Sequence, residues 1–323
     1  MMDWTDRHCR FFHRLLSRRA LLYTEMVTAD AVLHGNREWL LGFSPEEHPL
    51  ALQLGGSDPK KLADAAAIGA GEGFDEINLN VGCPSDRVQA GRFGACLMVE
   101  PQLVGECVAA MRARVDVPVT VKCRIGIDDQ DSEEDLERFI GRVSEAGCDL
   151  FIVHARKAWL SGLSPKQNRD IPPLNYSRVH RLKAAHPELT IVINGGIETD
   201  CAVAEHLEAV DGVMMGRAAY KTPFLLSSVD QQIFGCTLAP RSRGEVMEEL
   251  IAYAAAHIDC GGRLFSIARH ILGLYHGCPG ARQFRRHISE QAIRSGASVE
   301  VLREAVVFVE RGARGGVLSG VET

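Results

Sequence analysis

The sequence predicts a parallel α/β barrel followed by a helical segment. Short runs of Val, Ile and Leu alternate with amphipathic helical windows up to about residue 225. Continuous apolar strands of this kind are typical of parallel strands that are covered on both faces. After Phe234 the alternation stops and only helical periodicity remains. These observations indicate a (β/α)8 TIM barrel with a C-terminal all-α helical bundle.

The first part of the chain shows seven strand signals, one fewer than a closed barrel needs. Met1 already lies in a loop-like stretch, ahead of a helical window that carries Phe12 and Leu16. We therefore expect that a first strand precedes Met1 in the natural protein, or that another segment takes its place. The predicted strands are Leu21–Val27, Leu50–Leu54, Ile77–Val81, Val117–Val121, Leu150–Val153, Thr190–Ile193 and Gly212–Met215.

Helix signals separate these strands and then dominate the C-terminal part. Asp58 followed by proline, Pro101, and the Ser132-x-x-Asp135 pattern each mark the start of a helix. A polar stretch from residue 235 to 244 precedes four apolar stripes with helical spacing. We expect a catalytic barrel over residues 1–234 and a helical domain over residues 240–323.

Composition restricts the class of protein. Of 323 residues, 46% are hydrophobic and 24% are charged, and the net charge is −6. An acidic total disfavours indiscriminate nucleic-acid binding but allows a local basic face. Neither a signal-like start nor a membrane-spanning apolar run is present, so we expect a cytoplasmic protein without a membrane partner. The ten cysteines form no Cys-x-x-Cys pair, and we expect neither disulfides nor a metal site.

Residue pairs that contain glycine follow two consecutive strands near the end of the barrel segment. Asn194-Gly195-Gly196 follows one strand and Gly216-Arg217 follows the next. With a missing first strand restored, these would be strands seven and eight, where barrels commonly bind a phosphate. Turn glycines and a surface arginine are the alternative. Two such pairs in succession favour a phosphate site.

Polar residues close three further strands, where the mouth of a barrel would lie. They are Gln53, Lys122 and His154, and with Asn80 they could surround one cavity. A lysine beside a bound redox ring would stabilise negative charge that develops on the ring. The glycine-rich stretch from residue 69 to 73 superficially resembles a dinucleotide fingerprint. Because it precedes its strand, we reject that interpretation.

Two cysteines flank the loop after the third predicted strand. Cys83 lies in Gly-Cys-Pro, whose proline stiffens the turn, whereas Cys96 lies in an apolar context that favours burial. On spacing alone, Cys83 is explained equally well as a functional thiol and as a structural one.

Several long blocks resemble the tRNA-dihydrouridine synthases, and most closely their bacterial A-type subfamily. The resemblance covers nearly the whole chain. It implies an FMN-carrying barrel with a C-terminal tRNA-binding helical domain. It also implies an NADPH-driven oxidoreductase that reduces the C5–C6 bond of D-loop uridines, at positions 20 and 20a. The blocks are Leu79–Gln89, Val121–Gly126, His154–Lys166, Ile193–Ile197 and Gly212–Arg217.

The resemblance also implies roles for individual residues. Cys83, rather than Cys96, corresponds to the proton donor, which must carry its proton at rest. The family has a proline just before the two initial methionines, in a strand that this chain lacks. The implied flavin contacts are Met1, Met2, Gln53, Lys122, His154, Asn194, Gly195, Gly196, Gly216 and Arg217. The implied tRNA contacts are Asn80, Lys166, Arg169, Arg282 and Arg285.

An arginine-rich helical face supports an RNA partner. Arg282, Arg285 and Arg286 share one face of a predicted helix, opposite Phe284 and Ile288. An ordinary solvated face is the alternative, but three arginines without an interleaved acid favour a surface that tracks phosphates.

Two other functions compete with an enzyme that acts on tRNA. One is a small-molecule FMN barrel of the dihydroorotate or dihydropyrimidine type, for which the helical tail and its arginine face would have no use. The other is a barrel-derived RNA-binding protein without flavin, which would be colourless. Trp159 could stack on RNA or anchor its own loop, and the sequence does not decide between these. We expect the protein to be a monomer.

Overall fold

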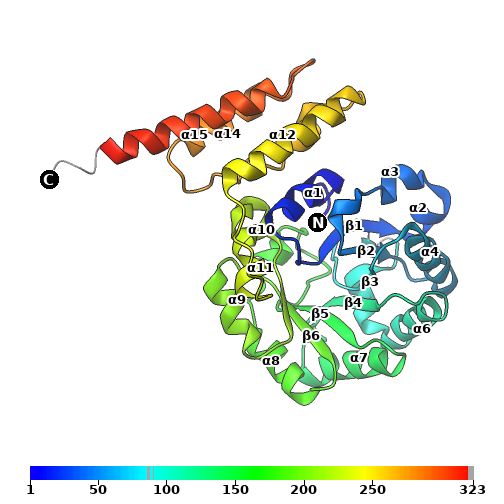
Figure 1. The fold of residues 1–323 in the computed structure, drawn as a ribbon. Helices are drawn as coiled ribbons and strands as arrows, with labels where there is room; N and C mark the ends of the chain where they lie inside the picture. The colour runs from blue at the N-terminus through cyan, green and yellow to red at the C-terminus, as the bar shows by residue number, and fades with distance from the viewer. Residues whose placement is uncertain (86–87, 90, 319–323) are drawn as a thin grey trace. The chain divides into compact units, whose positions relative to one another are not determined.

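The computed structural model describes residues 1–85, 88, 89 and 91–318. The chain divides into two compact units (Figure 1). The first unit comprises Met1–Met2, Leu21–Phe43 and Pro49–Gly216. The second comprises Asp3–Ala20, Ser44–His48 and the chain from Arg217 onward. Both units are therefore assembled from segments that are separate in the sequence.

A curled, all-parallel sheet of seven strands forms the centre of the first unit, in the order β1 to β7 along the chain. The seven predicted strands are confirmed, with ends that shift by at most three residues. Closure of this sheet into a complete eight-stranded barrel stays a prediction. The strands are β1 Leu22–Thr28, β2 Leu50–Gly55, β3 Glu76–Asn80, β4 Val119–Arg124, β5 Leu150–His154, β6 Thr190–Asn194 and β7 Gly212–Met214.

Helices lie on the outside of the curled sheet (Figure 1). The predicted starts are confirmed, because Asp58 caps α4 and a Ser132–Asp135 capping box begins α7. The α-helices are α2 Ala29–His34, α3 Arg37–Leu41, α4 Pro59–Glu72, α6 Pro101–Arg112, α7 Glu133–Glu145, α8 Tyr176–Ala185 and α9 Asp200–Leu207. The 3-10 helices are η2 Gly94–Val99 and η3 Gln167–Arg169.

Packing of α4 on the sheet shows which side of β3 faces inward. A Cβ added to Gly69 of α4 would lie 2.5 Å from Leu52 Cδ2 and 3.0 Å from Ile77 Cδ1. The helix approaches the sheet closely here, which explains the glycine without a dinucleotide. Because side chains alternate along a strand, Ile77 pointing toward α4 places Glu76, Asn78 and Asn80 on the inner face.

The second unit is helical. Its first helix, α1, is capped by Asp6, whose carboxylate accepts from the backbone N–H groups of His8 and Cys9 and pairs with His270 at 2.9 Å. The predicted boundary over residues 235–240 lies between α11 and α12, and tRNA binding by the C-terminal part stays a prediction. The elements are α1 Arg7–Leu16, η1 Pro45–Glu47, α10 Arg217–Lys221, η4 Pro223–Ser228, α11 Val229–Gln232, α12 Arg243–Asp259, α13 Leu264–Ala268, α14 Ala281–Gln291 and α15 Glu300–Leu318.

A buried ion pair joins α1 to η1 within this unit. Arg10 Nε lies 2.6 Å from Glu47 Oε2, and both side chains are almost wholly excluded from solvent. Sequence periodicity predicted α1 but gave no indication of these partners. Among the described residues, no helix combines the length and the apolar character needed to cross a membrane.

Candidate active site

The carboxyl ends of the parallel strands bring the predicted polar residues to one edge of the sheet. Register pairs Asn80 of β3 with Lys122 of β4. One step further along, Arg124 of β4 pairs with His154 of β5, which pairs with Asn194 of β6. Gln53 of β2 pairs with Asn78, one layer before Asn80. The side chains predicted at the mouth therefore lie in three successive layers, marked by Gln53, Lys122 and His154.

Cys83 lies on a turn immediately after β3, and this turn is held on both sides. Asn80 Oδ1 accepts the backbone N–H groups of Gly82 at 3.1 Å and Cys83 at 2.9 Å. The Cys83 carbonyl accepts from Ala95 N at 2.9 Å, which η2 brings back over the turn. Gly94 has a φ of 72°, and a Cβ there would lie 2.6 Å from that carbonyl oxygen. The half-buried thiol donates to Ser85 Oγ at 3.6 Å.

Arg124 holds the same turn by a hydrogen bond to its backbone. It is buried, and its Nε donates to the Gly82 carbonyl at 2.8 Å. Its Nη1 donates to the carbonyls of Lys157 and Asn168, each at 3.1 Å. One guanidinium thus joins the Cys83 turn to the loop after β5. Arg124 was not predicted from the sequence, although its position two residues after Lys122 on the same strand could have indicated it.

Lys122 and His154 differ in their charge at neutral pH. Lys122 Nζ donates to Asn194 Oδ1 at 2.9 Å, and Asn194 Nδ2 donates to the Met214 carbonyl at 2.7 Å. Burial, reinforced by the charge of Arg124, lowers the pKa of Lys122 to about 8. Burial and the neighbouring cations lower the pKa of His154 well below its ordinary value, so its imidazole is neutral at pH 7. Its Nδ1 accepts from Arg156 N at 3.2 Å.

Lys122, which is partly buried, and Arg124, which is buried, have amide and carbonyl oxygens as their described partners. Within the part of the chain that the structure describes, neither Lys122 nor Arg124 pairs with a carboxylate. Burying such charges is costly unless a counter-charge or a set of acceptors compensates for it. The arrangement therefore fits an anionic or electron-rich ligand at this edge.

The glycine turn after β6 has the backbone geometry of an anion site. Gly195 and Gly196 have φ values of 119° and 69°, which favour glycine. A Cβ on Gly195 would lie 3.2 Å from His154 Cε1, and Tyr176 OH donates to the Gly195 carbonyl at 2.7 Å. Because Tyr176 engages the Gly195 carbonyl, the N–H groups of the turn are left to bind a phosphate.

Gly216 follows β7 on the same side of the sheet. A Cβ there would lie 3.8 Å from Met1 Sδ, so Met1 is near the predicted phosphate site, whereas Met2 is largely exposed. Amide groups, a buried cation and a glycine turn form a donor set that fits a phosphorylated redox ring such as FMN.

The other predicted residues of the first unit lie on the loops that follow β3 and β5. Lys166 and Arg169 are exposed around η3, which Asn168 anchors by accepting from Trp159 N at 2.8 Å and donating to the Trp159 carbonyl at 2.8 Å. Lys157 Nζ lies 4.2 Å from the Trp159 ring centroid. Cys96 donates to the Phe93 carbonyl at 3.0 Å, and burial raises its pKa.

Arg217 and the predicted arginine face belong to the second unit. Arg217 begins α10, and its role as a flavin contact stays a prediction. On α14, Phe284 and Ile288 are buried while Arg282 and Arg286 are exposed. Arg286 Nε pairs with Glu290 Oε1 at 2.8 Å, one helical turn further along.

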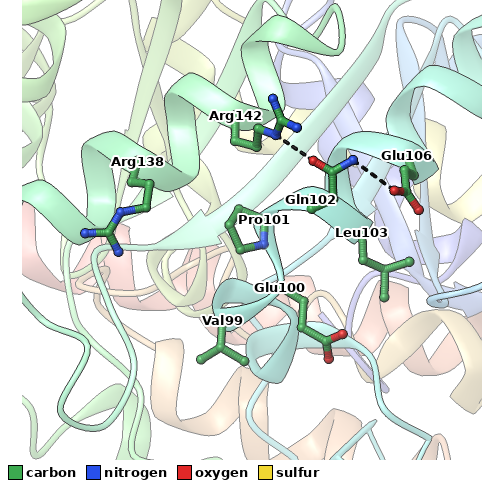
Figure 2. A pocket seen from close by; sticks show the side chains of 8 residues that line it. All are labelled: Val99, Glu100, Pro101, Gln102, Leu103, Glu106, Arg138 and Arg142. Carbon is green, nitrogen blue, oxygen red and sulfur yellow. Dashed lines mark hydrogen bonds between the residues drawn. The ribbon is translucent and has the colours of Figure 1, made fainter.

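A surface groove of about 500 Å³ lies elsewhere in the first unit, where α6 begins beside α7 (Figure 2). Gln102 crosses it, accepting from Arg142 Nε at 2.6 Å and donating to Glu106 at 2.9 Å. None of the predicted site residues line it. The lining residues are Val99, Glu100, Pro101, Gln102, Leu103, Glu106, Arg138 and Arg142.

Comparison with known proteins adds an independent finding. The family model described as dihydrouridine synthase (Dus) matches residues 1–309. The chain is 58% identical to the tRNA-dihydrouridine(20/20a) synthase of Vibrio parahaemolyticus, over 96% of this chain and 95% of that protein. Identity is 59% to the protein of that name in Vibrio cholerae and 57% to the one in Escherichia coli. The matches cover 94% and 93% of the length of those two proteins.

Solved structures also resemble the fold, and one of them is a 2-naphthoyl-CoA reductase in complex with 2-naphthoyl-CoA, with a TM-score of 0.52 and 11% identity. The match covers 71% of this chain and 47% of that one. At this identity the likeness concerns the fold alone.

Proposed function

Because the chain belongs to the dihydrouridine synthase family, we propose that it is an oxidoreductase that reduces uridines of tRNA to dihydrouridine. The observation that carries this proposal is the identity of 56–59% to several bacterial tRNA-dihydrouridine(20/20a) synthases over 96% of the chain. We extend the names of those relatives to this chain and propose uridines 20 and 20a of the D-loop as the targets.

FMN is the cofactor that the residues at the sheet edge suit best. The N–H groups of Gly195, Gly196 and Gly216 would hold its phosphate, with Arg217 as a further predicted partner. Gln53 and Lys122 would contact the ring, and Met1, Met2, His154 and Asn194 complete the predicted contacts. When bound and reduced by NADPH, the flavin supplies hydride to C6 of the uracil.

Cys83 would supply the proton. Hydride addition at C6 leaves negative charge on the uracil enolate, and protonation at C5 completes the reduction. The Cys83 thiol lies on a turn that is fixed by Asn80, Ala95 and Arg124, so its direction is set before substrate arrives. Because the side chain is only half-buried, solvent can return a proton to the thiolate after turnover.

The RNA would be held outside this edge. A uracil within a folded tRNA has to be turned out of its stack to reach a flavin at the end of β-strands. Asn80 could orient the base, while exposed Lys166 and Arg169 contact phosphates near the site. Arg282 and Arg285 on α14 would also contact tRNA phosphates. We propose that the segment 240–323 serves mainly this purpose, in the cytoplasm.

Mapping dihydrouridine in tRNA tests the function directly. Unmodified tRNA incubated with the purified protein, FMN and NADPH should gain dihydrouridine at positions 20 and 20a, whereas reactions without NADPH should not. Replacing tRNA with free uracil or dihydroorotate tests the small-molecule alternative. The proposal would be rejected if the protein reduced those compounds but formed no dihydrouridine in tRNA.

A further inference from the structure

A buried carboxyl group lies at the start of β3, on the inner face of the sheet. Glu76 is 5% exposed, and its Oε1 accepts from Thr120 Oγ1 at 2.6 Å and from Tyr23 OH at 2.7 Å. Burial raises the pKa of Glu76, and the two hydrogen bonds offset part of that rise. Burial also raises the pKa of Tyr23, so that hydroxyl keeps its proton and remains a donor.

From this carboxyl group, hydrogen bonds run without a break to the Cys83 turn. Asn78 Nδ2 donates to Thr120 Oγ1 at 2.8 Å, and Gln53 Nε2 donates to Asn78 Oδ1 at 2.9 Å. Asn80 Nδ2 then donates to Gln53 Oε1 at 2.8 Å. Asn80 Oδ1 finally accepts the Cys83 backbone N–H at 2.9 Å. Strand register brings these side chains next to one another, since Gln53 pairs with Asn78 and Asn78 pairs with Thr120.

The carboxyl group fixes the direction of every bond in this chain. Its Oε1 accepts from both Tyr23 OH and Thr120 Oγ1, so the single hydroxyl proton of Thr120 is used there. The lone pairs of Thr120 are then left for the Asn78 NH2 group, which turns Asn78 Oδ1 toward Gln53. The same reasoning orients the Gln53 amide and then the Asn80 amide. Thr120 and Asn78 have no solvent exposure, so water does not offer them other partners.

From this polarity we infer that Glu76 is a positioning residue for the proton donor. Acting through Thr120, Asn78 and Gln53, it holds the Asn80 carbonyl toward the backbone of Cys83 and so sets the turn that carries the thiol. The catalytic role of this series of hydrogen bonds rests on the function proposed above, whereas the hydrogen bonds themselves do not. If the amides were reversed, the Asn80 NH2 group would face the Cys83 N–H, and the turn would lose its bond.

Two substitutions at Thr120 separate polarity from packing. Thr120→Val keeps the shape of the side chain but removes the hydroxyl, so Asn78 is free to turn over. Thr120→Ser keeps the hydroxyl and loses only a methyl group. Ile77→Val serves as a control that weakens the packing of β3 without touching the chain of hydrogen bonds.

Two readouts that do not depend on turnover should report the difference in the full-length protein. Amide hydrogen exchange at Gly82 and Cys83 should become about tenfold faster in Thr120→Val, as should alkylation of Cys83 by iodoacetamide, followed by peptide mass spectrometry. Thr120→Ser and Ile77→Val should stay within about twofold of wild type. Dihydrouridine formation by Thr120→Val should slow while NADPH still reduces the bound flavin.

Equal exchange and alkylation in Thr120→Val and Thr120→Ser would overturn the inference. Should Thr120→Val not fold, Asn78→Asp, which keeps the shape and removes the amide donor, should show the same faster exchange at Cys83. Unchanged exchange in that variant would also overturn it. Failure of the proposed function would look different, since wild-type protein would then form no dihydrouridine while the exchange difference persisted.

Discussion

Positive charge is used differently in the two compact units. In the first unit, Arg124 is buried and Lys122 is partly buried near the end of β4, and their described partners are amide and carbonyl oxygens. On α14 in the second unit, Arg282 and Arg286 are exposed, and Arg286 already pairs with Glu290. Salt screens exposed charges but hardly affects buried ones. The buried pair is therefore suited to act on the atoms of one bound ligand, and the exposed set on an extended polyanion.

The largest expected effect concerns the buried region. Cys83→Ala removes the proposed acid and should lower the rate of dihydrouridine formation by about a thousandfold, in the range of general acid catalysis. Reduction of the flavin by NADPH and the affinity for tRNA should be unchanged. Cys96→Ala is the matched control and should retain activity, because that thiol is committed to the Phe93 carbonyl. Full activity of Cys83→Ala would assign the acid elsewhere.

Lys122→Met tests whether the buried cation serves the ligand. The substitution keeps the length of the side chain and should weaken FMN binding about thirtyfold, the value of one charge-assisted hydrogen bond. Quenching of FMN fluorescence measures the affinity. Lys183→Met removes a partly exposed lysine, which pairs with Asp211, and should leave FMN binding unchanged. Equal losses in the two variants would contradict a specific role.

The pH dependence of FMN binding sharpens the same point. Because the pKa of Lys122 falls to about 8, its charge is present at pH 7 and is lost as the pH rises. The loss of one proton weakens binding by up to about tenfold per pH unit. FMN affinity should therefore fall about tenfold between about pH 8 and pH 9.5. An anionic ligand raises the pKa of the lysine, so the decline extends upward in pH. The Lys122→Met variant should show no such decline.

The linked effect on stability has the opposite sign. The unfolded chain holds the Lys122 proton up to its ordinary pKa of 10.5, whereas the folded chain releases it near 8. The contribution of this group to the free energy of unfolding should therefore rise with pH between those values. Urea denaturation of flavin-free protein at several pH values, wild type against Lys122→Met, measures it. A difference that does not vary with pH would contradict the assignment.

The exposed region should yield smaller effects on binding and none on chemistry. Arg282→Ala combined with Arg285→Ala should weaken tRNA binding about fivefold and reduce the salt dependence of the affinity by one to two released ions, at about one per arginine. NADPH oxidation should not change. A loss of flavin reduction in this variant would remove the distinction between the two regions.

The smallest effect should come from Arg286→Ala. Its guanidinium is engaged by Glu290, so less of its charge is available to a phosphate. We expect a change of less than about twofold in tRNA affinity, measured at the same salt concentrations as for the double variant. An effect as large as that of the double variant would move the contact surface along α14.

Much of the fold could be predicted because it depends on local patterns. Apolar runs gave the strands, and Asp58 and Ser132 gave the starts of helices. The positions of Gln53, Lys122 and His154 toward the carboxyl ends of their strands could be predicted from the strand signals, whereas their role at a site stays a prediction. Arg124 and Thr120 were not found, since their partners depend on strand register. The alternation of Glu76, Asn78 and Asn80 with Ile77 and Leu79 was a visible signal, which the apolar interpretation of that strand passed over.

The composition of the second unit has a consequence for how the protein is made. Its first helix, α1, leaves the ribosome early, but Asp230 and His270, which hold the ends of that helix at Ser17 and Asp6, are translated only after the entire sheet. Domains tend to fold as units during synthesis. The sheet can therefore form before the residues that pack against α1 have been translated. Premature termination after β7 would leave the apolar face of that helix, Phe12, Leu15 and Leu16, without the later helices and open to chaperones and proteases.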